Sequence, residues 1–367
     1  MAKIDDLFKF LKDNGGSDLH LSSGLVPQLR RNGKVEAIPG WPEFTDESLR
    51  ALLSEITTEA QWAHYTKNLD LDFAYALKGV ARFRANYLNQ ERGAAAVFRI
   101  IPEKIRSLEE LKTPPAIAEF ADLQSGLVLV TGPTGSGKST TLASVIDKVN
   151  TKYSKHIITI EDPVEFVHQN KNCTLSQREV GTDTKSFATA LRAAIRQDPG
   201  VILVGEMRDM ETIGLAITAA EMGVLVFGTL HTNNAAKTVD RLIDAFPFDQ
   251  QAQVRTMLSE SLAGVVSQLL LRTVDGKGRI AVHEILSKTP GLPNIIREGN
   301  TPMIHSIIQS GKSQGMQSMD DALFALVDEK RITPEDAYHR ANDKRRFEHL
   351  ISDEHLEETK PKEPAKK

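Results

Sequence analysis

The fold is decided by the stretch Gly126-Leu-Val-Leu-Val-Thr131-Gly-Pro-Thr-Gly-Ser-Gly-Lys138-Ser-Thr140 and its continuation to Val149. Residues 126–131 form an apolar run typical of a buried strand, and residues 140–149 continue as a helix. Between them, glycines at positions 132, 135 and 137 let the backbone curl so that its N–H groups face a phosphate. The N-terminus of the helix adds a favourable dipole. Because every position of the motif is filled between a strand and a helix, the stretch predicts a P-loop.

Each part of this loop has a chemical task. Lys138 is expected to reach the β- and γ-phosphates of the nucleotide, and Ser139 to hold Mg²⁺. The chain has no Asn-Lys-x-Asp guanine signature, which favours ATP over GTP. The predicted cofactors are therefore ATP and Mg²⁺. The predicted nucleotide-binding residues are Gly132, Pro133, Thr134, Gly135, Ser136, Gly137, Lys138, Ser139 and Thr140.

The sequence around the loop alternates between apolar strands and helices. The strand-like runs are Leu127–Thr131, Ile157–Ile160, Val201–Val204 and Val224–Thr229. This alternation predicts a largely parallel sheet with helices on its faces, hence an α/β fold. The chain before it has a different pattern, with a first helix, a hairpin near residues 27–38 and three strands near residues 69–101. It is expected to form a smaller α+β domain.

These patterns suggest a division of the chain. Residues 1–101 would form the N-terminal domain, and residues 126–350 the ATPase domain with a helical C-terminal part. Residues 102–125 are expected to be a connector whose prolines and polar residues suit a hinge. The charged tail, residues 351–367, is expected to be disordered.

Composition narrows the class of protein. The net charge is −4, so no global basic field favours nucleic acid, and the single cysteine, Cys173, excludes a cysteine-rich metal site. No apolar run approaches the roughly 20 residues that span a bilayer, and the acidic N-terminus does not resemble a signal peptide. We therefore expect a cytoplasmic protein that does not insert into a membrane. Any work at a membrane would go through a partner.

Acidic residues follow two of the predicted strands. Gly205-Glu206 comes after Val201–Val204, where a Walker B strand normally ends in a carboxylate, so Glu206 could act through water on the metal or on the nucleophile. Glu161 and Glu165 follow Ile157–Ile160. Either could orient or deprotonate the attacking water, and the sequence does not choose between them. His231 follows the next strand and is expected to sense the γ-phosphate.

With these residues in place, the chain resembles the type IV pilus retraction ATPases, the PilT/PilU family of the secretion ATPase superfamily. The resemblance runs from Ser17-Asp-Leu-His20 to about Leu350. Besides the P-loop, it rests on Ile160-Glu-Asp-Pro-Val-Glu165, Val204-Gly-Glu-Met-Arg-Asp209 and Gly228-Thr-Leu-His-Thr232. The unusual Gly205-Glu206 pair is a trait of this family, so it does not argue against catalysis.

The resemblance implies a PAS-like N-terminal domain, a RecA-like ATPase domain and a homohexamer with nucleotide between the two domains. It also implies a location at the cytoplasmic face of the inner membrane, a platform protein of the pilus machine as partner, and a paralogous retraction ATPase as a further partner. Arginines of the first domain would approach the phosphates. Arg82 and Arg84 share one face of a strand by its two-residue period, and Arg99 lies on the next strand. Arg84 and Arg99 are the favoured phosphate contacts.

Two features separate this chain from the usual family pattern. Pro293 stands where the retraction enzymes commonly carry an arginine, in a segment that follows Thr289-Pro290. Asp275–Arg279 and the long helical end look similar to the accessory PilU-type enzyme, whereas the loop looks like the principal one, which is preferred.

Two other functions were weighed against retraction. A pilus-assembly or type II secretion ATPase usually carries a four-cysteine zinc site, which a single cysteine cannot form. A nucleotide-gated adaptor without hydrolysis would not need the carboxylates of Glu161, Glu165 and Glu206.

Overall fold

The computed structural model describes residues 2–31, 33–101, 104–276 and 278–351. The chain forms two compact units. The first contains the chain up to Ile105 together with Asp162–Val167, and the second contains Arg106–Glu161 and the chain from His168 onward. The tail expected to be disordered, apart from its first residue, lies outside the described residues, as do Pro102 and Glu103 of the expected connector.

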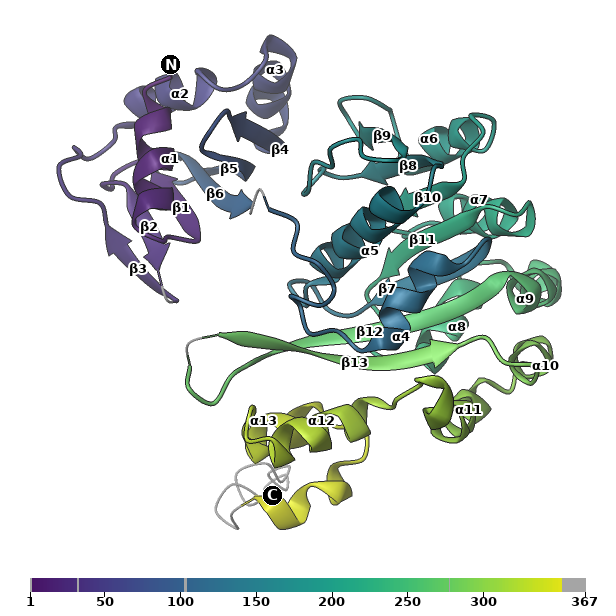
Figure 1. Ribbon diagram of the computed structural model, residues 1–367. Coiled ribbons are helices and arrows are strands. Elements are labelled where there is room, and N and C mark those ends of the chain that lie inside the picture. The colour runs from purple at the N-terminus through teal and green to yellow at the C-terminus, as the bar shows by residue number, and fades with distance from the viewer. Residues whose placement is uncertain (1, 32, 102–103, 277, 352–367) are drawn as a thin grey trace, which may run out of the picture. The chain divides into compact units, whose positions relative to one another are not determined.

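The first unit is built on one antiparallel sheet of six strands in the order β3-β2-β1-β6-β5-β4 (Figure 1). Its strands alternate buried and exposed side chains, as the period of two requires. Along β5, Ala81, Phe83, Ala85 and Tyr87 face the core. The elements are α1 (Ile4–Asp13), β1 (Asp18–Ser22), β2 (Gln28–Arg31), β3 (Lys34–Ala37), α2 (Asp46–Ser54), α3 (Glu59–Asn68), β4 (Asp70–Leu77), β5 (Ala81–Gln90) and β6 (Gly93–Ile101).

Aromatic rings fill the core of this unit. The ring of Phe8, on α1, stacks on Phe83 at a centroid distance of 4.2 Å and meets the edge of Phe98 at 5.0 Å. A capping box begins α3: Thr58 accepts from the N–H of Gln61, and the Gln61 side chain accepts from the N–H of Thr58. The α+β character expected of this part of the chain is therefore confirmed.

The second unit is built on a sheet of seven strands in the order β13-β12-β7-β11-β10-β8-β9, all parallel except for β13 (Figure 1). Its central strands are apolar on both faces because helices cover both faces. The strands are β7 (Gly126–Thr131), β8 (His156–Glu161), β9 (Thr174–Glu179), β10 (Val201–Val204), β11 (Leu225–Leu230), β12 (Leu262–Arg272) and β13 (Arg279–Ser287).

Two hydrophobic cores lie on opposite sides of this sheet. Val128 and Val130 pack with α4 (Pro115–Glu119) and α5 (Lys138–Lys152). Leu127 and Leu129 pack with the other helices, which are α6 (Phe187–Ala194), α7 (Met210–Glu221), α8 (Ala235–Asp244), α9 (Phe248–Ser261), α10 (Leu292–Arg297) and α11 (Ile304–Ser310).

A third core joins the end of the β12–β13 hairpin to the last helices. It contains Leu271 and Val282 from the hairpin and Leu323 and Phe347 from the C-terminal part. The helices here are α12 (Met319–Asp328) and α13 (Pro334–Arg340). The short 3₁₀ helices of the unit are η1 (Phe120–Asp122), η2 (Thr301–Met303), η3 (Lys312–Gln314), η4 (Lys344–Arg346) and η5 (Glu348–Leu350).

The structure divides the chain differently from the sequence-based division. Leu108, Ile117 and Phe120 are buried against α5, so residues 106–125 belong to the second unit and do not form a connector. Asp162–Val167 belongs to the first unit, where the carbonyl of Val164 accepts from Arg82 Nε at 3.0 Å. Both differences arise from tertiary packing, which the chain order does not reveal.

Candidate nucleotide site

The phosphate loop joins the carboxyl end of β7 to the first turn of α5. Gly132, Gly135 and Gly137 all have positive φ, at 141°, 79° and 91°. Backbone turns of this kind can bring successive N–H groups together as a concave anion-binding nest. Pro133, Thr134 and Gly135 are exposed at the top of the loop. The loop therefore has the backbone shape that the sequence predicts.

Lys138 is buried at the base of the loop. Its Nζ donates to the carbonyls of Gly132, at 2.8 Å, and Pro133, at 3.1 Å. These bonds lay the amino group along the loop, within reach of an anion bound in the nest. Ser139 follows on the first turn of α5, and its side chain is exposed.

Three predicted site residues follow neighbouring strands of the sheet. Register pairs Val204 of β10 with Ile160 of β8 on one side and with Gly228 of β11 on the other. Glu161, Glu206 and His231 therefore come from the same edge, and β7 with its loop lies directly beside β11. In open α/β sheets this carboxyl edge is where ligands bind.

Glu206 is the electrostatic centre of this edge. It accepts from Arg208 Nη2 at 2.7 Å, from Arg208 Nε and from His231 Nε2 at 3.0 Å. Burial acts to raise the pKa of Glu206, but the hydrogen bonds and charge of Arg208, with His231, outweigh it and hold the pKa below its ordinary value. Glu206 is therefore ionised at neutral pH, which suits a group that orients water or supports a metal.

Gly205 has a steric reason to be glycine. Its N–H donates to the Ile160 carbonyl at 2.8 Å, and a Cβ here would lie 3.1 Å from that oxygen and 3.2 Å from the Cα of Glu161. A side chain at 205 would therefore be in tight contact with the end of β8.

The two candidate bases lie in different units. Glu161 ends β8, and its Oε1 accepts from the Thr159 hydroxyl at 2.7 Å. Glu165 belongs to the first unit, 3.9 Å from Arg84 Nη1. Glu161 is thus the one that shares the carboxyl edge with Glu206.

The arginines of the first unit form a pair. Arg84 on β5 and Arg99 on β6 are direct cross-strand partners, so their side chains emerge on the same face. Each has an acid of its own: Arg84 Nη2 lies 2.6 Å from Asp72 Oδ2, and Arg99 Nε lies 2.8 Å from Asp18 Oδ1. Hydrogen bonding to Asp72 raises the pKa of Arg84.

Two further residues of the site, Arg208 and Gln268, were not predicted from the sequence. Arg208 lies in the segment Val204-Gly-Glu-Met-Arg-Asp209, two positions after Glu206. Gln268 lies in the apolar run Val265-Val-Ser-Gln-Leu-Leu. The polar pair Ser267-Gln268 within this run could have indicated a buried polar contact. The side chain of Gln268 contacts Ser136 of the phosphate loop and Thr141 in the first turn of α5.

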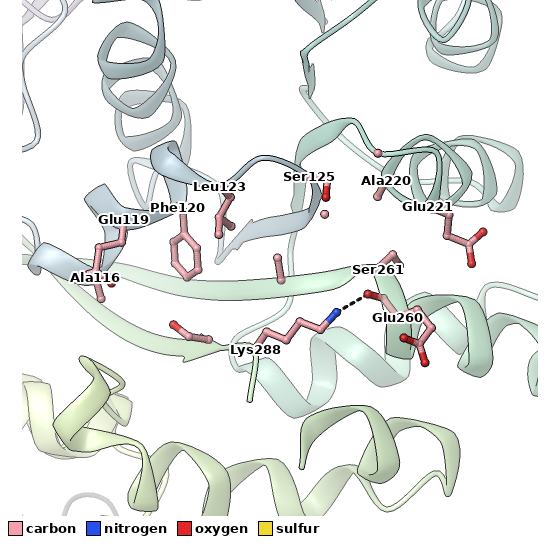
Figure 2. A pocket seen from close by; sticks show the side chains of 14 residues that line it. Ala116, Glu119, Phe120, Leu123, Ser125, Ala220, Glu221, Glu260, Ser261 and Lys288 are labelled. Carbon is pink, nitrogen blue, oxygen red and sulfur yellow. Dashed lines mark hydrogen bonds between the residues drawn. The ribbon is translucent and has the colours of Figure 1, made fainter. Parts of the chain in front are cut away.

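A separate hollow of about 590 Å³ lies at the opposite edge of the sheet (Figure 2). It is lined by Phe120, Gly126 and Ser261 among others, and Lys288 there donates to the carbonyl of Glu260. Gly126 is the first residue of β7, so this hollow is at the amino end of the strand that carries the phosphate loop. It is not the nucleotide site.

The residues of the loop fit a nucleotide with Mg²⁺. The nest and Lys138 suit phosphate, and the exposed hydroxyl of Ser139 and the ionised Glu206 suit a hard cation. Among the described residues, no group of three or more His, Cys, Asp or Glu side chains is arranged to hold a metal ion. An ion here would therefore need oxygens from phosphate and water, as is usual for Mg²⁺.

A family model described as type II/IV secretion system protein matches residues 66–335. The chain belongs to this family. Within it, the chain is 51% identical over 338 residues to the type IV pilus retraction ATPase PilT of Pseudomonas aeruginosa, covering 92% of this chain and 98% of that protein. It is 39% identical over 340 residues to the type IV pilus ATPase PilU of the same organism, covering 93% of this chain and 89% of that one.

A solved structure agrees with this assignment. A crystal structure of the pilus retraction motor PilT with bound ADP superposes with a TM-score of 0.87 at 43% identity, covering 95% of this chain and all of that one. The α/β fold with a P-loop ATPase unit and a smaller N-terminal unit is therefore the fold of this family. Within the described part of the chain, no helix combines the length and the apolar character needed to span a bilayer.

Proposed function

We propose that this protein is an ATPase that powers the retraction of type IV pili, and hence twitching motility. One observation carries the proposal: the match to PilT extends over nearly the full length of both chains, first unit included. The higher identity to PilT than to PilU supports the principal rather than the accessory retraction enzyme.

The proposed chemistry uses the carboxyl edge of the second unit. The loop N–H groups and Lys138 bind the phosphates, and bound Mg²⁺, held by Ser139 and through water by Glu206, would neutralise their charge. Glu161 orients the attacking water and accepts its proton, whereas the low pKa of Glu206 suits it to hold charge. His231 Nε2–H donates a hydrogen bond to the Glu206 carboxylate, so we propose that it senses the γ-phosphate through that carboxylate.

The proposed motor requires more than one unit and more than one copy. We propose that Arg84 and Arg99 exchange their acidic partners for phosphate when ATP binds, and that Glu165 takes part in that exchange. The two units would act as PAS-like and RecA-like domains of a homohexamer. The ring would work in the cytoplasm against an inner-membrane platform protein of the pilus machine, with a paralogous retraction ATPase as a further partner.

The proposal is tested with two variants of the site and one control. Lys138→Ala should abolish ATP hydrolysis, because it removes a contact to the phosphates. Glu206→Ala should keep ATP binding but lose turnover, because Glu206 acts on the attacking water or the metal and not on binding. Glu221→Ala, at the exposed end of α7, should hydrolyse ATP normally. Each would also be expressed in a Pseudomonas aeruginosa strain lacking PilT, where only wild type and Glu221→Ala should restore pilus retraction. Turnover near the wild-type rate in Glu206→Ala would remove that residue from the mechanism.

A further inference from the structure

Gln268 lies on β12 directly beside the phosphate loop. β12 runs parallel to β7, and register pairs Ser267 with Thr131, the last residue before the loop. The two hydroxyls lie 2.9 Å apart. Gln268, one residue further, is 3% exposed, so its amide is placed where unpaired polar atoms would be costly.

Both ends of the Gln268 amide make hydrogen bonds. Its Nε2 donates to the carbonyl of Ser136 at 2.7 Å. Its Oε1 accepts from the Thr141 hydroxyl at 2.8 Å and lies 3.2 Å from His283 Nε2. The Ser136 carbonyl can only accept, so the amide nitrogen must face it and the oxygen must face the other two groups.

His283 completes this arrangement from β13. Burial lowers the pKa of His283 to about 4, so the ring is neutral and carries one proton. Because Gln268 Oε1 can only accept, that proton is on Nε2. The chain of donors therefore runs from His283 and Thr141 into the amide oxygen, and from the amide nitrogen into the loop.

The bond to Ser136 has a consequence for the next residue. In a planar trans peptide, the C=O of one residue and the N–H of the next point in opposite directions. Drawing the Ser136 carbonyl toward β12 therefore turns the N–H of Gly137 away from β12, into the nest. This N–H is one of those that the motif needs for phosphate.

Gln268 also packs closely against two glycines of the loop. A Cβ at Gly132 would lie 2.2 Å from the main-chain oxygen of Gln268, and a Cβ at Gly137 would lie 2.8 Å from its Nε2. One residue of β12 thus packs against both ends of the loop, its main chain at Gly132 and its side chain at Gly137.

We propose that Gln268 is the positioning residue of the phosphate loop: from β12 it holds the Ser136 carbonyl outward and so keeps the Gly137 N–H directed at the nucleotide's phosphates. The proposal rests on the proposed function, because it assumes that the loop binds a nucleoside diphosphate or triphosphate. Gln268 acts through the loop and does not contact the reacting atoms.

The test measures binding of ADP with Mg²⁺, which needs neither turnover nor pili. Gln268→Leu keeps the volume but removes the donor, and should raise Kd for ADP about tenfold, the effect of one hydrogen bond. Gln268→Glu places a second acceptor against the Ser136 carbonyl and should weaken binding at least as much. Gln317→Leu is the matched control, because Gln317 donates to the main-chain oxygen of His283 and does not contact the loop. It should change Kd less than twofold.

A second readout separates positioning from general destabilisation. With glycine-selective ¹⁵N labelling, the Gly137 amide of wild type and Gln317→Leu should shift strongly when ADP binds, and in Gln268→Leu it should shift much less. Should Gln268→Leu not fold, Thr141→Val, which removes one donor to the same amide, should still weaken ADP binding two- to threefold. Equal ADP affinity and equal Gly137 shifts in wild type and the Gln268 variants would overturn the proposed role of Gln268 but not the proposed function. A wild-type protein that bound no ADP would overturn the proposed function as well.

Discussion

At the level of single residues, Arg208 helps to hold the pKa of Glu206 below its ordinary value. Burial by itself raises the pKa of a carboxyl group, and here the guanidinium reverses that effect. Arg208 is the more exposed partner, with a side chain 75% accessible against 20% for Glu206. The pair therefore tunes a group at the reactive edge and is not a buried structural bridge.

Removing Arg208 should move the acid limb of hydrolysis. In Arg208→Ala, burial is no longer opposed by the guanidinium, so the pKa of Glu206 rises and the carboxylate is lost at a higher pH. The pH–kcat profile should lose activity at higher pH than in the wild type. Arg192→Ala, which removes an exposed arginine paired with Glu211, is the control and should leave the profile unchanged. Superimposable profiles for all three proteins would show that Arg208 does not set the charge of Glu206.

Buried histidines should make the second unit sensitive to acid. Burial lowers the pKa of His168 to about 4, and the same holds for His283. Between pH 6.5 and about 4, each of these histidines is protonated in the unfolded chain but neutral in the folded chain. The free energy of unfolding therefore falls as the pH is lowered through this range. Each histidine should contribute up to about 3 kcal/mol to this loss.

Urea unfolding at several pH values measures this effect. His168→Gln should lose less stability than the wild type between pH 6.5 and 4.5, whereas His339→Gln, on the exposed end of α13, should follow the wild type. If the slope of stability with pH is the same in all three proteins, His168 does not bind its proton differently in the folded and unfolded states.

At the level of elements, the buried carboxylate of Glu284 connects strand β13 to helices α8 and α12. Glu284 on β13 is 3% exposed and accepts from the N–H of Ala235, at 2.8 Å, and of Met319, at 3.4 Å. These are the first residues of α8 and α12, whose opening N–H groups lack partners within the helix. Glu284 thus ties the helix after the His231 loop to the C-terminal helices.

Glu284→Ala should therefore be strongly destabilising. Two buried N–H groups would lose their acceptor, at a cost of about 2–4 kcal/mol together. Glu284→Gln should be milder, because one oxygen remains to accept and no charge is buried. Glu260→Ala, at an exposed ion pair with Arg297, should change the free energy of unfolding by less than about 0.5 kcal/mol. A Glu284→Ala protein as stable as the Glu260 variant would contradict this account.

At the level of the whole molecule, we expect nucleotide to control the separation of the two units. Arg84 and Arg99 belong to one unit and Lys138 to the other, and a γ-phosphate attracts both. ATP should therefore favour a closed arrangement and ADP should release it, provided that the closed state binds ATP more tightly.

Paired spectroscopic labels measure that separation. Cysteines introduced as Lys67→Cys on α3 and Glu221→Cys on α7 would carry the labels, since the native Cys173 is buried. The distance between labels should differ between the ATP-analogue and ADP states, and Arg84→Ala should reduce this difference more than it reduces ADP binding. The same distance with ATP analogue, with ADP and without nucleotide would exclude control of the separation of the units by nucleotide. Light scattering that showed only monomer in a fully active enzyme would likewise exclude a shared site.

The sequence alone determined the local features of this protein. The P-loop with its flanking strand and helix, the strands that carry Glu161, Glu206 and His231, and the shared face of Arg82 and Arg84 all follow from periodicity and backbone preferences over a few residues. The edge strand β9 was missed because its residues, Thr174–Glu179, are mostly polar. The long β12–β13 hairpin was also missed, although its strands are apolar.

Only the tertiary structure decided which of these residues meet. Strand order brings Glu206 to His231, cross-strand register sets Arg84 opposite Arg99, and β12 brings Gln268 to a loop 132 positions away from it. Packing also places residues 106–125 in the ATPase unit and Asp162–Val167 in the first unit. The physical reason is that these contacts join segments far apart in the chain. They depend on which strands pair and in what register, and no short stretch of sequence encodes that choice by itself.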